Sequence, residues 1–140
     1  IYSSHNIEHL YPHEVGTALM EFHRVLAEDG FVMLTCPDLQ SVCQLVAEDK
    51  LLEPAYTSPA GPIAPIDMLY GFRPSMAAGN LYMSHRSGFT KKTLIGTFQH
   101  FGFKSVAGSR REANFDLFCL ASKKELAEDE LITLAKAHFP

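Results

Sequence analysis

The densest group of side chains that could take part in chemistry lies between residues 3 and 13. This segment has the sequence Ser-Ser-His-Asn-Ile-Glu-His-Leu-Tyr-Pro-His and follows Ile1-Tyr2, which has the character of a strand. Small hydroxyls and an imidazole placed directly after a strand can exchange hydrogen bonds with a ligand, and open α/β sheets bind ligands at this edge. We therefore predict a ligand site around Ser3, Ser4 and His5.

Two other interpretations of this segment stay open. In the first, the small polar side chains only satisfy the turn after the strand, while Glu8 and His9 are solvated or cap a helix. In the second, residues 5–9 spell H-x-x-E-H, a zinc-hydrolase pattern that needs both histidines on one helical face. Pro12 typically begins a helix instead of continuing one, which disfavours the zinc hydrolase, so we expect no metal ligands.

Apolar spacing predicts the elements that position this segment. Across residues 11–28 apolar side chains recur at steps of four, three and four, the spacing of one helical face. The run Phe31–Cys36 lies between Gly30 and Pro37 and is typical of a short strand buried on both faces. Asp38 can then cap a further helix.

Residues 51–88 have a different character, because prolines and glycines interrupt every regular pattern. Five of the eight prolines and four of the nine glycines fall in this segment. Apart from a helical turn at Ile66–Tyr70 we predict mostly loop, and loops of this length are often lids or binding loops. The aromatic and methionine content indicates that the loop packs on the rest of the chain, so we expect a lid-like insertion.

The remaining residues complete an alternation of helices and strands. Thr90 can cap a helix that ends near Gly102, and residues 104–111 and 114–122 predict a hairpin. A last helix is expected from Ala127 to His138. This order predicts an α/β fold, in which a sheet flanked by helices ends with an antiparallel hairpin.

Composition limits the class of protein. The chain has 140 residues, 46% hydrophobic and 20% charged, with a formal net charge of −4, which fits one globular domain and disfavours nucleic-acid binding. We find no apolar stretch long enough for a membrane span and no leader resembling a signal peptide. The three cysteines include no C-x-x-C pair, which favours reduced thiols and a soluble cytoplasmic protein.

Several of these segments together resemble a known family. They are Ser4–Leu10, Glu21–Leu26, Glu28–Gly30, the strand leading to Pro37-Asp38, and farther on Phe89-Thr90 and Gly102-Phe103. In this order they resemble the second half of class I S-adenosylmethionine-dependent methyltransferases, specifically the type 11 group. The resemblance covers about residues 1–122.

The resemblance implies a partial Rossmann-like sheet. Its strands would be the family's strands four, five, seven and six, with strand seven antiparallel. The family holds its cofactor against a glycine-rich loop after strand one, whereas no G-x-G occurs in this sequence. Residues 1–140 would then be the C-terminal portion of a truncated methyltransferase domain, inactive alone, whose complete form binds S-adenosylmethionine.

The resemblance also assigns roles to particular residues. Ser3, Ser4 and His5 match positions that line the cofactor's methionine end, and His5 is the candidate general base for transfer to an unknown methyl acceptor. The positions that would line the substrate pocket are Glu8, His9, Pro37, Asp38, Tyr82 and His85. The last two lie in the lid-like insertion.

A different class of function remains open. The chain could be a non-catalytic α/β module that completes its sheet by self-association, or by docking on another protein. In that case the strand near Ile1 would offer the unpaired edge, because free strand edges invite partners.

Overall fold

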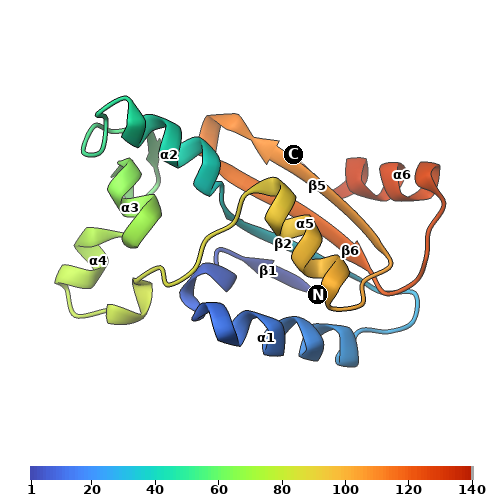
Figure 1. Ribbon diagram of the computed structural model, residues 1–140. Coiled ribbons are helices and arrows are strands. Elements are labelled where there is room, and N and C mark those ends of the chain that lie inside the picture. Colours follow the sequence, from blue (N-terminus) through green and yellow to red (C-terminus); the bar gives the residue numbers. More distant parts are fainter. Residues whose placement is uncertain (140) are drawn as a thin grey trace.

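A four-stranded mixed sheet is the centre of the fold in the computed structural model, which describes residues 1–139 (Figure 1). The spatial order is β1 (Tyr2–Ser4), β2 (Phe31–Pro37), β6 (Asp116–Ser122) and β5 (Ser105–Arg111). β1 runs parallel to β2, whereas β6 is antiparallel to both of its neighbours. The α/β class, the parallel first strand and the closing antiparallel hairpin are confirmed.

Apolar sequence accounts for the central strands. All seven residues of β6 are buried, as expected for a strand with a neighbour on each side and helices on its faces. In β2 the fully buried side chains are those of Val32, Leu34 and Cys36, which point toward one face. The outer edge of β1 pairs with no strand among the described residues.

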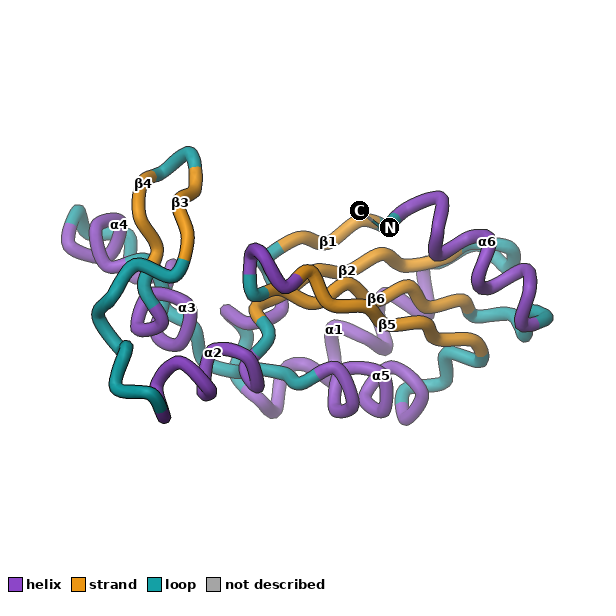
Figure 2. Tube along the Cα trace, turned by 90° about the horizontal axis from the view of Figure 1, so that it is seen from above, coloured by secondary structure: helices purple, strands orange, loops and turns teal. Residues whose placement is uncertain are grey.

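Helices cover both faces of this sheet (Figure 2). α1 (Pro12–Val25) and α5 (Lys91–His100) lie on one face, where Leu19, Leu94 and Phe98 join the main core. α6 (Glu128–His138) lies on the other face and brings the Phe139 ring to within 5.8 Å of the Phe118 ring. The order of helices and strands therefore produces three layers.

The helix ends follow the predicted caps, with one difference. Asp38 accepts a hydrogen bond from the Gln40 amide at the start of α2 (Leu39–Ala47), and Thr90 accepts one from Thr93 at the start of α5. α1 ends at Val25 rather than near Glu28, because Leu26 already has an extended backbone. Its buried side chain still packs on the core.

Residues 51–88 are more regular than expected. They form a hairpin of β3 (Tyr56–Ser58) and β4 (Gly61–Ile63), then α3 (Pro65–Tyr70), α4 (Arg73–Ala77) and the short turn η2 (Leu81–Met83). These elements make a separate lobe beside one end of the sheet (Figure 1).

The prediction that this segment is mostly loop was therefore wrong. Pro65 and Pro74 stand in the first turn of a helix, where the missing amide costs nothing, so they start helices instead of breaking them. A second core cluster, in which Val42 of α2 packs with Ile63 and Met68, holds the lobe against α2.

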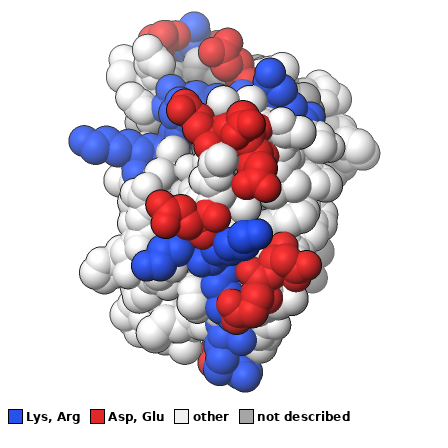
Figure 3. Space-filling model, turned by 90° about the vertical axis from the view of Figure 1, so that its right-hand side faces the viewer, with Lys and Arg blue, Asp and Glu red and all other residues white. Residues whose placement is uncertain are grey.

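Surface features agree with the composition. On the face shown in Figure 3, acidic and basic side chains are interspersed and neither sign forms a continuous field. No helix within residues 1–139 is both long enough and apolar enough to cross a membrane.

Candidate functional site

A cavity of about 260 Å³ lies where the parallel strands β1 and β2 end. His5 follows β1 and Pro37 ends β2, and both line the cavity. The facing wall comes from the lobe and is largely apolar, with Tyr56, Met68 and Phe72 among its residues. This is the position at which open α/β sheets bind ligands, as the sequence predicts for the segment after the first strand.

His5 is held between two carboxylates. Its backbone has a φ of 47°, in the left-handed region, and its amide donates to the carbonyl of Thr35. This turn places Nε2 at 3.6 Å from Oδ2 of Asp116 and Nδ1 at 3.3 Å from Oε1 of Glu8. Asp116 and Glu8 together outweigh burial and raise the pKa of His5 to about 9. The imidazole is therefore cationic at neutral pH, which disfavours the predicted role of general base.

Asp116 is a member of this site that sequence analysis missed. Its side chain is buried and accepts hydrogen bonds from Nε and Nη2 of Arg111 at 3.1 and 2.5 Å. Burial alone would raise the pKa of Asp116, but His5 and Arg111 outweigh it and hold that pKa below its usual range. In the sequence, the feature that could have pointed to Asp116 is an acidic residue at the start of an otherwise apolar strand.

Glu8 carries a buried carboxylate without a hydrogen-bond donor. It lies in η1 (Ile7–His9), it is 1% exposed, and neither oxygen accepts a hydrogen bond from any described residue. The His5 ring is close enough for charge attraction but is not aligned as a donor. The interpretation of Glu8 as a solvated or capping residue was therefore wrong.

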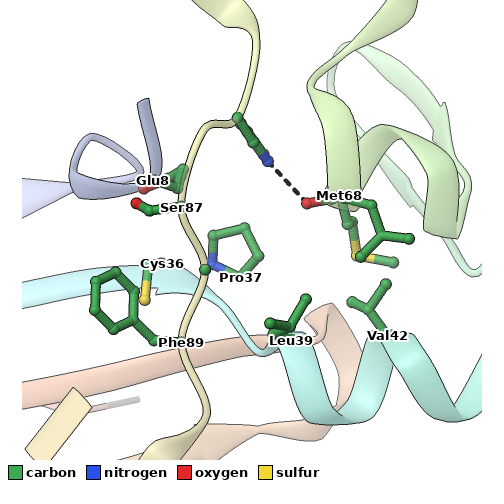
Figure 4. Close-up of a pocket in the computed structure, with 11 residues that line it drawn as sticks. Glu8, Cys36, Pro37, Leu39, Val42, Met68, Ser87 and Phe89 are labelled. Carbon is green, nitrogen blue, oxygen red and sulfur yellow. Dashed lines mark hydrogen bonds between the residues drawn. The ribbon is translucent and has the colours of Figure 1, made fainter. Parts of the chain in front are cut away.

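His9 and His85 line the same cavity and contact each other. Their ring centres are 4.9 Å apart, although the residues come from η1 and from the end of the lobe segment. Nδ1 of His9 lies 3.1 Å from the Ser84 carbonyl, and Nδ1 of His85 lies 2.8 Å from the Met68 carbonyl (dashed in Figure 4). Burial lowers the pKa of His85, which favours a neutral ring.

A smaller hollow of about 20 Å³, also lined by Glu8, adjoins the cavity (Figure 4). Glu8 and Ser87 line it on the polar side, while Cys36, Leu39 and Phe89 supply apolar walls. This space is enough for roughly one water molecule. The Glu8 carboxylate, which accepts no hydrogen bond from the described residues, therefore borders this small hollow.

Backbone hydrogen bonds fix the lobe segment against η1. The Glu8 carbonyl accepts from the amides of Arg86 and Ser87 at 2.7 and 3.1 Å, and the Ser87 hydroxyl donates to the Ile7 carbonyl. The guanidinium of Arg86 also lies 4.6 Å from the centre of the Tyr11 ring. His85 is thereby held against Glu8 and His9.

The other predicted site residues lie outside this cavity. The Ser4 hydroxyl is hydrogen-bonded to that of Thr35 at 2.8 Å, and Ser3 is half-buried within β1. Asp38 is 1% exposed and is occupied by the α2 cap and by Arg110. Tyr82 is 83% exposed and lines no part of the cavity wall given by the described residues.

The helix required by the H-x-x-E-H pattern is not formed. His5 precedes η1 with a left-handed backbone and is engaged by Asp116, so His5 and His9 do not share a helical face. The structure brings His5, Glu8 and His9 together with Pro37 and His85, from three segments of the chain that are far apart in sequence.

No protein-family model and no curated protein matches this sequence.

Proposed function

We propose that these residues form the substrate-side half of an S-adenosylmethionine-dependent methyltransferase. The supporting observation is the strand order β1-β2-β6-β5, in which one parallel pair is followed by two antiparallel pairings. This order is the one expected for strands four, five, seven and six of the class I methyltransferase sheet. The resemblance of several segments to the type 11 group also supports the proposal.

The described residues can supply one side of a cofactor site. Ser3, Ser4 and His5 lie at the carboxyl end of β1, where the methionine end of S-adenosylmethionine would approach. A glycine-rich cradle would have to come from strands added to the free edge of β1, since this sequence has no G-x-G. The proposal rests on the sheet order and on the resemblance.

The cavity suits the acceptor side of such a reaction. S-adenosylmethionine supplies an electrophilic methyl group, so the protein has mainly to align an acceptor and exclude water. The apolar wall of Tyr56, Met68 and Phe72 can desolvate a small acceptor in about 260 Å³. His5, as a cation, would stabilise a deprotonated acceptor oxygen rather than remove its proton.

A second candidate follows from the unpaired edge of β1. Tyr2 is 68% exposed on that strand, and the edge offers free backbone groups to a further strand. The chain would then be a non-catalytic module that self-associates or docks on another protein. Sedimentation of the 140-residue chain tests this candidate, because a strict monomer without a partner contradicts it.

Calorimetric titration with S-adenosylmethionine tests the methyltransferase proposal. The 140-residue chain is compared with a longer natural chain that includes the residues encoded before Ile1, both in buffer with EDTA. We expect saturable binding by the longer chain, weakened by His5→Ala, and little or none by the shorter one. Absence of binding by both chains would reject the methyltransferase.

A further inference from the structure

We propose that Glu8, His9 and His85 form a binding site for a divalent transition-metal ion, with Zn²⁺ the best-matched ion. One ligand atom from each of the three side chains lies within 4.8 Å of the other two. Two imidazole nitrogens and one carboxylate oxygen are a donor set that zinc accepts in proteins. The site does not depend on the proposed methyltransferase activity, because it rests only on these three side chains.

The Glu8 carboxylate has the capacity for a further cation beside the His5 ring. It is 1% exposed, and neither of its oxygens accepts a hydrogen bond from the described residues. A buried charge is costly unless it is paired or coordinates a metal. Nδ1 of His5 lies 3.3 Å from Oε1, and one carboxylate oxygen of Glu8 lies within 4.8 Å of a ring nitrogen of His9 and of His85.

Both histidines are oriented as ligands. A carbonyl oxygen can only accept, so the contacts to Ser84 and Met68 require Nδ1 to carry the proton in His9 and in His85. Each Nε2 then has a free lone pair. A ring whose other N–H donates to a backbone carbonyl is the usual arrangement of metal-bound histidine, because the contact fixes tautomer and orientation.

The surrounding backbone keeps the three ligands together. η1 supplies Glu8 and His9, and the hydrogen bonds from Arg86 and Ser87 to the Glu8 carbonyl hold the neighbouring His85 beside them. His85 is also tied to the lobe, since its own amide donates to the Tyr70 carbonyl. Little rearrangement is then needed to bring the ligand atoms to bonding distance.

The donor set also predicts the character of the site. Imidazole favours zinc and its transition-metal neighbours over Mg²⁺ and Ca²⁺, which prefer oxygen ligands alone. Glu8, His9 and His85 all border the cavity of about 260 Å³. A fourth coordination position would therefore face a space that a water molecule or small ligand can enter, as in catalytic rather than structural zinc sites.

Titration with the metal alone tests this site. The 140-residue chain is treated with EDTA, dialysed and titrated with ZnCl₂ in a calorimeter, with circular dichroism to verify that each variant is folded. We expect one ion per chain, and His9→Ala and His85→Ala should each weaken binding by about 100-fold. Glu8→Gln, which keeps the side-chain shape, should also weaken it.

Matched variants separate this site from other zinc ligands of the chain. His100→Ala removes a histidine on α5, and Cys43→Ser removes an exposed thiol, and neither should change the affinity. Equal affinity in the parent chain, His9→Ala and His85→Ala would overturn the proposal. So would the absence of saturable binding by the folded parent chain.

Discussion

Nε2 of His5 lies 3.6 Å from Oδ2 of Asp116, so the end of β1 and the start of β6 are joined by charge across the intervening strand β2. Arg111 contacts the same carboxylate from β5. Side chains from β5 and β6 and from the end of β1 therefore meet in one polar cluster beside the cavity. The charge state of His5 determines what this cluster can do to a ligand.

Removing the charge of Asp116 should lower the pKa of His5. In Asp116→Asn the first of the two carboxylates that raise this pKa is gone, and burial then favours the neutral imidazole. NMR titration of the ring protons should give a pKa near 9 in the parent chain and a clearly lower value in the variant. His5→Gln assigns the signal, and an unchanged pKa in Asp116→Asn would exclude this charge pairing.

Stability should depend on alkaline pH through the same residue. Because the pKa of His5 rises from 6.5 in the unfolded chain to about 9 in the folded protein, protonation stabilises the fold below pH 6.5. This contribution is lost as the pH increases through about 9. Urea unfolding between these limits should show a falling free energy of unfolding, with a smaller slope in His5→Gln. Parallel curves for the two proteins would contradict the assignment.

Gly71 should not tolerate a side chain. It has a φ of +103°, and a Cβ atom there would lie 2.0 Å from the Met83 carbonyl oxygen. We expect Gly71→Ala to cost about 3 kcal/mol in the free energy of unfolding. Gly61→Ala is the control, because Gly61 also has a positive φ but has nothing within 4 Å of the added atom. A similar cost at both positions would mean that backbone conformation alone matters.

Asp67 should be the main polar support of the lobe. Its buried carboxylate accepts from the Ala64 amide and from the amide and guanidinium of Arg73, and these bonds outweigh burial and lower the pKa of Asp67. Asp67→Asn should destabilise the protein by about 2 kcal/mol, measured by urea unfolding. Glu21→Gln, at an exposed pair with Arg24, should leave stability unchanged. Equal effects of both changes would contradict a structural role for Asp67.

Much of the fold could be predicted because its signals are local. Residues 31–36 were recognisable as a buried strand from an unbroken apolar run, and Asp38 and Thr90 as caps from side-chain chemistry. In residues 51–88 the same proline residues are compatible with a loop and with a helix start. Contacts that are distant in sequence, such as those around Val42 and Ile63, decide between the two.

The site could be predicted only in part, because some of its contacts join segments that are distant in sequence. His5, Glu8 and His9 are adjacent in sequence, so their types and position after a strand were enough to single them out. Asp116 and the contact between His9 and His85 depend on pairing between segments that are far apart in the chain. The burial of Glu8 depends on the segment of residues 84–87 that covers it, and no local pattern indicates that cover.

We propose that the carboxyl ends of β1 and β2 belong to the cofactor and substrate side of a methyltransferase. The most direct measurement is NMR of the proposed longer chain, with residues before Ile1, during titration with S-adenosylmethionine. The amide signals of Ser4, His5 and Glu8 should shift and saturate together, while those of α6 stay in place. If those three signals do not respond, or if the shifts cluster on α6, S-adenosylmethionine does not bind at the ends of β1 and β2.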